Sequence, residues 1–429
     1  MCMVNWENLP FRTDLFLRMV RTGLGVQKDA HDSQLDRPAV GCPVPRCVRH
    51  GEAGMKVLVT GAAGFIGMHV AQAFLARGDE VVGIDDLSDQ YEVALKYARL
   101  SRIQSHPRFR FLKMDVSDRP AVNACFAANG FEQVVHLATQ AGGGRAVSHP
   151  RESAQPNLVG FINMLEGCRQ HGVPHMVYAS SSNVYSGLRQ MNLASRNLHG
   201  PSASEVEAHK MPNELMAQTY SRLHGLATTG LRFFTVYGPW GRPDMAYYGF
   251  TRALLAGDPI PSTHGGAVSH GLTYVDDIVA GILQALRLPS RTMADERAHP
   301  GAQARVLNIG SHDPVRLLDF VAALENAVGR EAELKMMPMN FDDAGVPVDT
   351  TLQRQPDLVG ERRSTMPLAE GVQRFVHWYL GYHGLRSGKE PSAQRRAAVF
   401  EDPSSVQMMP ALRSLISRST QGQHIGGAH

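Results

Sequence analysis

The first residues whose types and spacing could do chemistry are three glycines. Gly61, Gly64 and Gly67 form a GxxGxxG motif directly after an apolar, strand-like run. A turn of this kind needs positive φ angles and a close approach of the backbone, so that main-chain N–H groups and the start of the next helix can meet a pyrophosphate. The motif is weak by itself, but here a strand pattern precedes it and a helical pattern follows. We therefore predict a dinucleotide-binding turn that includes Phe65 and Ile66; a turn without a ligand is the alternative.

Acidic residues follow at the ends of the next two strand-like runs. Asp85 stands at about the spacing expected of a carboxylate that accepts hydrogen bonds from the adenosine ribose. With Asp86 beside it and no arginine there, the site would repel a 2′-phosphate, which favours NAD over NADP. Asp115 and Val116 would lie along the adenine, although a turn-forming aspartate explains Asp115 equally well.

Short runs of β-branched residues alternate with helical patterns between residues 56 and 236. This alternation is typical of an α/β fold with a doubly wound parallel sheet of the Rossmann type, covered by helices on both faces. A smaller mixed C-terminal domain that binds the substrate is predicted to follow. We expect strands at 56–60, 80–84, 109–114, 132–137, 175–180 and 229–236, helices at 65–77, 92–103, 119–128, 157–171 and 207–225, and later helices near 247–256, 275–287, 316–328 and 367–382.

The two ends of the chain lack such patterns. Residues 1–54 are predicted to be a disordered or non-native extension, because Met55 stands directly before the first strand and suggests a native start. The predicted boundaries are then 55–236 for the NAD-binding domain, 237–383 mainly for the substrate-binding domain, and 384–429 for a tail.

Bulk composition excludes several classes of protein. The chain has 429 residues and a net charge of +3, and without a long basic run this gives no case for nucleic acid. No stretch of about 18 apolar residues avoids charge, so no membrane span is predicted. The five cysteines lack the spacing of a disulfide framework or a zinc pair. This favours a reducing compartment, the cytoplasm, and gives no metal site.

Further segments carry a family resemblance. Together they resemble the extended short-chain dehydrogenase/reductase family, and within it the NAD-dependent epimerases and dehydratases of nucleotide sugars. The run from Phe233 to Met245, Phe-Phe-Thr-Val-Tyr-Gly-Pro-Trp-Gly-Arg-Pro-Asp-Met, is most like that of the UDP-glucuronate 4-epimerases. The matching segments are Leu137–Gly142, Asn157–Gly160, Tyr178–Tyr185, Asn213–Ala217, Gly230–Met245 and Thr273–Ile278.

The resemblance implies a permanently bound NAD that oxidises a UDP-sugar at C4. The 4-keto intermediate would then rotate in the site, so that hydride returns to its other face. A tyrosine would remove the proton of the 4-hydroxyl, and a lysine four residues later would bind the nicotinamide ribose and keep the pKa of the tyrosine low. Position by position, Lys210 matches this lysine and Ser181 matches the catalytic hydroxyl. The family also implies that Leu137, Ala138 and Asn157 contact the cofactor.

Four residues match those that hold the sugar nucleotide in the family: Ser180, Ser182, Thr235 and Arg242. Arg242 would lie near the sugar carboxylate, which a guanidinium binds through two parallel hydrogen bonds; a solvated loop arginine is the alternative. The family further implies a homodimer formed through a four-helix bundle, here from helices 92–103 and 157–171 or 207–225.

The sequence departs from the family at the catalytic tyrosine. Val206 stands four residues before Lys210, and valine has no proton to give or take. Pro212 is expected to disturb the helix unless the helix begins only near Met211. Other departures lie on the substrate side: an arginine is moved by one position in 142–145, and 270–272 lacks an arginine expected at the UDP phosphates.

Three explanations of the missing tyrosine stay open. The first is a sequence artefact across 186–212, and the second is a degenerate relative that binds NAD without turning a sugar over. The third is a substitute base, for which His209 and Glu207 are the candidates. We therefore predict a nucleotide-sugar epimerase with impaired catalysis, and the alternative is a non-catalytic NAD-binding or interaction protein derived from one.

Overall fold

The computed structural model describes residues 54–140, 149–182, 184, 205–262, 269–287, 303–310, 315–336 and 366–385. All of these residues belong to the unit Ala53–His429. Nearly all of the predicted extension at the start of the chain and of the predicted tail lies outside the described residues.

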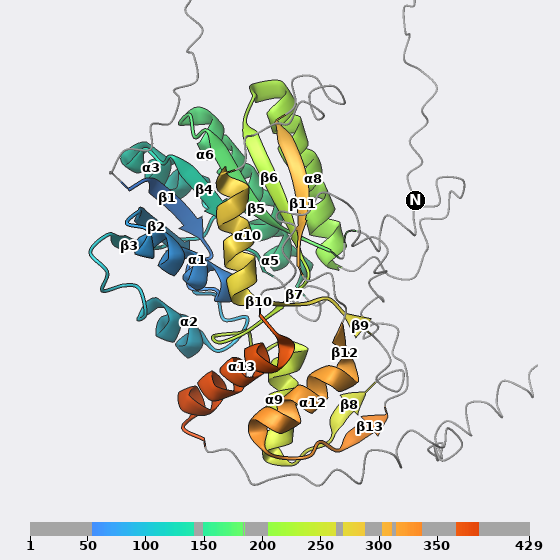
Figure 1. Cartoon of the computed structure of the whole chain (residues 1–429). Coiled ribbons are helices and arrows are strands. Elements are labelled where there is room, and N and C mark those ends of the chain that lie inside the picture. The colour runs from blue at the N-terminus through green and yellow to red at the C-terminus, as the bar shows by residue number, and fades with distance from the viewer. Residues whose placement is uncertain are drawn as a thin grey trace, which may run out of the picture. The chain divides into compact units, whose positions relative to one another are not determined.

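A parallel sheet of seven strands forms the centre of this unit (Figure 1). Its strands lie in the order β11-β6-β5-β4-β1-β2-β3, and each neighbouring pair is parallel. The chain builds outward from β1 in one direction through β2 and β3, and in the other through β4, β5 and β6. The strands are β1 Lys56–Thr60, β2 Glu80–Asp85, β3 Phe109–Lys113, β4 Gln133–His136, β5 His175–Ser181, β6 Ala227–Phe233 and β11 Ala304–Ile309.

Apolar residues on both faces of the sheet explain why helices cover both. In β1, Val57 and Val59 belong to one hydrophobic cluster and Leu58 belongs to another, because successive side chains of a strand point to opposite faces. The first cluster includes residues of α1 and α10, and the second includes residues of α3, α6 and α8. The bounds are α1 Phe65–Ala76, α3 Arg119–Asn129, α6 Gly160–Gln170, α8 Glu205–His224 and α10 Val275–Arg287.

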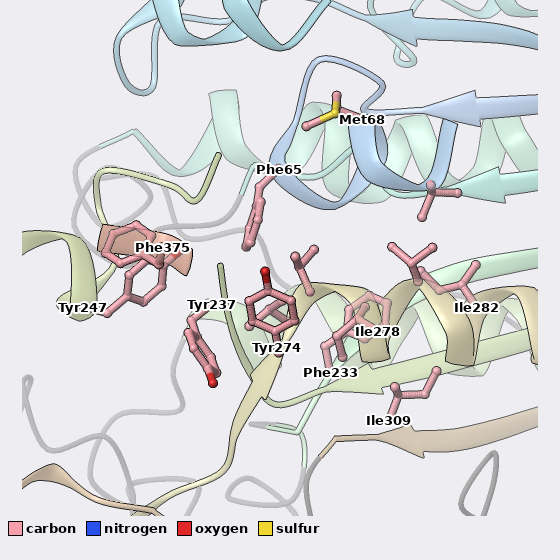
Figure 2. Close-up of a cluster of buried hydrophobic side chains, with 14 of the residues drawn as sticks. Phe65, Met68, Phe233, Tyr237, Tyr247, Tyr274, Ile278, Ile282, Ile309 and Phe375 are labelled. Atoms are coloured by element: carbon pink, nitrogen blue, oxygen red, sulfur yellow. The ribbon is translucent and has the colours of Figure 1, made fainter. Parts of the chain in front are cut away.

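The first cluster continues into the C-terminal part of the chain. Figure 2 shows Phe65 of α1 and Ile278 of α10 in the same group of side chains as Tyr247 and Phe375. The remaining helices are α2 Val93–Leu100, α5 Pro150–Ala154, the π-helix η1 Gln155–Val159, α9 Ala246–Ala256, α12 Leu317–Val328 and α13 Leu368–His383. Two-stranded sheets pair β7 Thr235–Tyr237 with β10 Leu272–Tyr274, β8 Ile260–Ser262 with β13 Leu334–Met336, and β9 Ser269–His270 with β12 Val315–Arg316.

Several elements differ from the sequence-based expectations. The strand expected at 229–236 is two strands, because the chain leaves the main sheet after Phe233 and β7 pairs with β10 instead. The strand β11 was not predicted, and it returns from the C-terminal part of the chain to pair with β6. The division into domains at residue 236 stays a prediction.

The interruption expected at Pro212 does not occur. Helix α8 begins at Glu205 and runs through Pro212 to His224. The helix packs against β5, β6, β11, α6 and η1, and such tertiary contacts can offset the unfavourable helix propensity of one proline. Positions 206 and 210 are therefore one turn apart on a continuous helix.

No helix in the described part of the chain is both long enough and apolar enough to span a bilayer.

Candidate functional site

A cavity of about 500 Å³ lies at the carboxyl ends of the central strands. Its walls come from both sides of the point where the strand order reverses between β1 and β4, which is where ligands bind in open α/β sheets. Every predicted site residue except Asn157 lines it: Gly61, Gly64, Phe65, Ile66, Gly67, Asp85, Asp115, Val116, Leu137, Ala138, Ser180, Ser181, Ser182, Lys210, Thr235 and Arg242. The roles of these residues stay predictions.

The glycine turn has the geometry of an anion-binding loop. Gly61 has a φ of +71°, in the left-handed region that favours glycine. A Cβ on Gly67 would lie 2.0 Å from the carbonyl oxygen of Gly61, so only glycine lets α1 start this close to the turn. Among the described residues no side chain caps the helix at Gly64, and the first turn of α1 holds no acid. The first amides of α1 thus point at the cavity without a side-chain acceptor, which fits the pyrophosphate of a dinucleotide.

Asp85 is held firmly in the wall of the cavity. Its Oδ2 accepts a hydrogen bond from the amide of Ala63 at 3.1 Å, and its Oδ1 accepts one from the amide of Leu87 at 2.9 Å. Burial raises the pKa of Asp85 above its ordinary value, and the nearby ammonium of Lys96 opposes this rise.

Lys96 is a residue that the sequence reasoning missed. Its Nζ lies 3.5 Å from Asp85 Oδ1 and 3.8 Å from Asp86 Oδ1, and it donates to Ser88 Oγ at 3.0 Å. The lysine balances one of the two carboxylates, which leaves the local charge negative and keeps the expected preference for a ribose without a 2′-phosphate. Little in the sequence indicated this contact, because a lysine in a surface helix is normally solvated.

A buried threonine fixes the end of β4. Thr60 Oγ1 accepts hydrogen bonds from the amides of Leu137 and Ala138 at 3.2 and 3.0 Å, and it lies 2.8 Å from His136 Nδ1. The threonine hydroxyl must therefore donate to Nδ1, which requires a neutral histidine. Burial, with the positive charge of Lys210 nearby, lowers the pKa of His136 to about 3 and agrees with that assignment.

Asn157 lies behind the cavity wall. Its Oδ1 accepts from Thr139 Oγ1 and from the amide of Gln140, both at 2.8 Å, and its Nδ2 donates to the Gln140 carbonyl at 2.9 Å. Nδ2 also lies 3.3 Å from His209 Nδ1. Since the amide of Gln140 can only donate, Nδ2 is the donor toward His209, whose Nδ1 accepts. Asn157 thus orients the segment after β4.

Lys210 reaches the cavity from α8. Its Nζ donates to Thr139 Oγ1 at 3.0 Å and to the Ala179 carbonyl at 3.1 Å. Burial lowers the pKa of Lys210 to about 8, and the carboxylate of Glu214 one turn later opposes the shift. The ammonium therefore lies at the cavity wall, and the role that the resemblance implies for it stays a prediction. The side chain of residue 206 is not among those described.

Glu214 connects the serines at the end of β5 to the neighbouring strand. Ser180 Oγ donates to Glu214 Oε1, and Arg232 of β6 donates to both carboxylate oxygens, at 2.9 and 2.6 Å. The amide of Ser182 donates to the Phe233 carbonyl at 3.0 Å. These contacts hold the strand-end serines in place, and the sequence reasoning assigned no role to Glu214 or Arg232.

Arg242 lines the cavity from the segment after β7. Its Nε donates to Asp244 Oδ1 at 3.0 Å, its Nη2 donates to Asp244 Oδ2, and its amide donates to Tyr247 Oη at 3.3 Å. Burial acts to lower the pKa of Arg242, but the pairing with Asp244 outweighs it and the pKa is raised. Asp244 also lines the cavity and was not predicted.

The remaining departures from the family lie partly outside the described residues. The altered run at 142–145 cannot be placed, and neither can the stretch 186–204. Within 270–272, the Gly271 carbonyl accepts from the amide of Thr235 at 3.0 Å, and Leu272 begins β10. This segment therefore supports the wall at Thr235 through its backbone.

Known proteins share this sequence and arrangement. Residues 57–310 match the NAD dependent epimerase/dehydratase family. Protein CapI of Staphylococcus aureus is 40% identical over 338 residues, which cover 77% of this chain and 99% of that protein. UDP-glucuronate 4-epimerase 2 of Arabidopsis thaliana is 40% identical over 351 residues, which cover 79% of each chain.

A solved structure agrees with both. The crystal structure of UDP-glucuronic acid 4-epimerase from Bacillus cereus, in complex with UDP-glucuronic acid and NAD, superposes with a TM-score of 0.61 and 26% identity, over 76% of this chain and all of that one. The predicted fold class and the family resemblance are confirmed. This chain belongs to the NAD dependent epimerase/dehydratase family.

Proposed function

We propose that this chain binds NAD and a UDP-sugar and epimerises UDP-glucuronate at C4, at a rate reduced by the loss of the catalytic tyrosine. The observation that carries this proposal is that one cavity is lined by the phosphate-binding turn, by Asp85, by the strand-end serines, by Lys210 and by Arg242. The Arabidopsis relative and the Bacillus cereus structure named above are UDP-glucuronate 4-epimerases, and the solved one contains NAD.

The cofactor would be held by three parts of the cavity. The first amides of α1 would bind the pyrophosphate, Asp85 would accept from the adenosine ribose, and Lys210 would donate to the nicotinamide ribose. When bound, NAD supplies reversible two-electron oxidation of the sugar at C4.

Removal of the proton from the sugar 4-hydroxyl is the step that the missing tyrosine affects. Ser181 lines the cavity and can hold that hydroxyl, and Lys210 supplies a positive charge. Val206 has no group that accepts a proton, so the step lacks its positioned base. Such a loss lowers the rate by about 10²–10⁴.

His209 is a poor substitute base. Its Nδ1 is occupied by the amide of Asn157, and the residue is not among those that line the cavity. This contact argues against His209 as the base that replaces the missing tyrosine. The side chain of Glu207 is not described.

The pairing of two protomers is also a proposal. Large apolar side chains on neighbouring helices are exposed: Val159 of η1 by 41%, Ile162 of α6 by 39% and Leu215 of α8 by 59%. Helices α6 and α8 contact each other, so they favour the predicted four-helix bundle in a homodimer over one built with α2. Light scattering at several concentrations should report a dimer, and Ile162→Glu should shift it toward monomer. A monomer in the unmodified protein contradicts this arrangement.

The function is tested with the unmodified full-length chain. After purification, extraction and chromatography should recover close to one NAD per chain. Incubation with UDP-glucuronate should then produce UDP-galacturonate slowly, and the reverse reaction should reach the same ratio. Ser181→Ala serves as the control that assigns slow turnover to this cavity, because it removes the hydroxyl and leaves the nucleotide side intact.

The runner-up function predicts a different result from the same experiment. A non-catalytic NAD-binding or interaction protein would carry NAD and show no interconversion above the Ser181→Ala control. A protein without NAD and without turnover would contradict both functions. The replacement of the tyrosine by Val206 is the observation that favours the runner-up.

A further inference from the structure

A completely buried arginine joins the phosphate-binding turn to the segment that precedes Arg242. Arg99, in helix α2, has no exposed surface. It donates through all five of its N–H groups: Nε to the Trp240 carbonyl at 3.0 Å, Nη2 to the Trp240 and Gly241 carbonyls at 2.7 and 3.0 Å, and Nη1 to the Ala63 carbonyl at 3.2 Å and to Tyr91 Oη at 2.5 Å. Within the described residues its acceptors are all neutral, so the side chain orients main-chain carbonyls and does not serve a salt bridge.

One end of this network is the phosphate-binding turn. Ala63 lies between Gly61 and Gly64, and its amide donates to Asp85. Arg99 takes the carbonyl of the same residue. Both main-chain polar groups of Ala63 are therefore fixed by side chains from outside the turn.

The other end is the segment that carries Arg242. Trp240 has a φ of +66°, a conformation that a bulky residue keeps only when its surroundings impose it. Its carbonyl is bound by Arg99, while its ring packs against Trp378 and Tyr382, and the guanidinium of Arg102 lies over it. Arg242 follows two residues later in the wall of the cavity.

We propose that Arg99 is a positioning residue that sets Arg242 relative to the phosphate-binding turn and thereby determines how well the site distinguishes a sugar carboxylate from a neutral sugar. The inference rests on the proposed function, because it assigns the carboxylate to Arg242. Arg99 itself does not touch the sugar in this account.

The geometry requires an arginine. A guanidinium presents five donors in one rigid plane, and here each of them has an acceptor. A lysine would keep the charge but has three donors at a single point, so it cannot hold Ala63 and the Trp240–Gly241 carbonyls together.

The experiment compares three purified, NAD-loaded proteins by calorimetry: the unmodified chain, Arg99→Lys and Arg102→Met. Each is titrated with UDP-glucuronate and with UDP-glucose, and the ratio of the two dissociation constants is the preference for the carboxylate. Arg99→Lys should lower this preference at least tenfold, while NAD content stays close to that of the unmodified chain. Arg102→Met is the matched control. Arg102 is an exposed arginine whose guanidinium lies over the ring of the same Trp240, and its loss should change the preference less than twofold.

A double-mutant cycle separates positioning from a general loss of stability. If Arg99 acts through Arg242, then Arg99→Lys should have no further effect on the preference in an Arg242→Gln background. Should Arg99→Lys fail to fold, Tyr91→Phe takes its place, since it removes one acceptor of Arg99 and leaves the carbonyl contacts. We expect it to lower the preference about threefold, again only when Arg242 is present. A direct effect of Tyr91 on the ligand would persist in the Arg242→Gln background.

The outcomes are distinct. If the unmodified chain binds UDP-glucuronate and UDP-glucose equally, the result contradicts both the proposed function and the role of Arg99 that rests on it. An unmodified chain that prefers UDP-glucuronate, together with an Arg99→Lys protein that prefers it equally, overturns the inference alone. Effects of Arg99→Lys or Tyr91→Phe that add to that of Arg242→Gln also overturn it.

Discussion

At the pyrophosphate end of the cavity the chain offers main-chain groups of a single turn, whereas on the sugar side it depends on side chains from three separate segments. The turn at Gly61–Gly67 needs only small residues and a helix that starts in the right place. The sugar side needs Ser181, Lys210 and Arg242, together with a base from position 206. A site made of backbone tolerates change in most of its residues, but a site made of side chains can lose its chemistry through one replacement. Under the proposed function, this difference explains why the replacement of one side chain impairs catalysis and leaves NAD binding in place.

The largest effect is expected from restoring a tyrosine at position 206 on the sugar side. Val206→Tyr places a phenol one helical turn before Lys210, whose ammonium can lower the pKa of that phenol. We expect the rate of UDP-glucuronate epimerisation to rise by about 10²–10⁴, measured by chromatography under single-substrate conditions.

A control accompanies this variant. Adding Lys210→Met to Val206→Tyr should remove most of the gain, because the phenol would return to a pKa of about 10. If Val206→Tyr carries NAD and stays inactive, the missing base is not the sole defect, and the segment 270–272 becomes the first candidate.

The next test asks whether the nucleotide side is as tolerant as its backbone chemistry suggests. Gly67→Ala would put a Cβ 2.0 Å from the carbonyl oxygen of Gly61. We expect a loss of about 3 kcal/mol in the free energy of unfolding and the loss of bound NAD. Gly130→Ala is the control, since Gly130 has a φ of +58° with no atom within 4 Å of the added Cβ. It should lose about 1 kcal/mol and keep NAD. Equal effects of the two substitutions would contradict this account of the turn.

A pH series tests whether Lys210 is truly buried on the sugar side. Burial lowers its pKa to about 8, whereas an unfolded lysine titrates near about 10.4. Between these values the unfolded chain binds more protons, so the stability contributed by this group rises as the pH increases through that window. Below about pH 8 the full destabilisation, about 3 kcal/mol, is present.

Urea unfolding of the unmodified chain and of Lys210→Met, from pH 7 to about 10.4, measures the effect. The difference between the two should move by about 3 kcal/mol in favour of the unmodified chain as the pH rises. The tyrosines and cysteines that titrate in the same range contribute equally to the stability of both proteins, so their contributions cancel in the difference. Parallel profiles would show that the lysine is solvated.

The smallest expected effect concerns Asp244. Its carboxylate occupies Arg242 and would repel a sugar carboxylate at the same place. Asp244→Asn should therefore raise the affinity for UDP-glucuronate relative to UDP-glucose about threefold, because a partly exposed ion pair contributes about 0.2–1 kcal/mol. Asp319→Asn, in an exposed pair with Arg316, should leave both affinities unchanged. A lower relative affinity after Asp244→Asn would mean that Asp244 orients Arg242 for binding.

Local patterns were sufficient for much of the fold. The glycine turn, Asp85 and the strands up to β5 were predicted within a few residues, because each depends on neighbouring residues and on the strand and helix periods. The division after Phe233 and the pairing of β11 with β6 were not predicted, since both depend on partners far along the chain.

The candidate site shows the same limit. The family resemblance identified side chains that line the cavity. Asn157 does not line it and holds Thr139 and Gln140 instead, so a contact between Asn157 and the cofactor stays a prediction. Lys96 and Glu214 were missed, because a charged residue in a helix shows its partner only when the fold brings the partner near.

The sequence by itself determined that a glycine turn of the dinucleotide-binding type exists, that an acid ends the strand after it, and that no tyrosine stands four residues before Lys210. These statements need only residue types and spacing, because a glycine turn, a strand end and a missing hydroxyl are local facts. Only the tertiary structure decided that α8 passes through Pro212, that Asp244 occupies Arg242, and that Arg99 joins the phosphate turn to the segment before Arg242. Arg99 and Trp240 are 141 positions apart, and a hydrogen bond across that distance depends on packing that no local pattern contains.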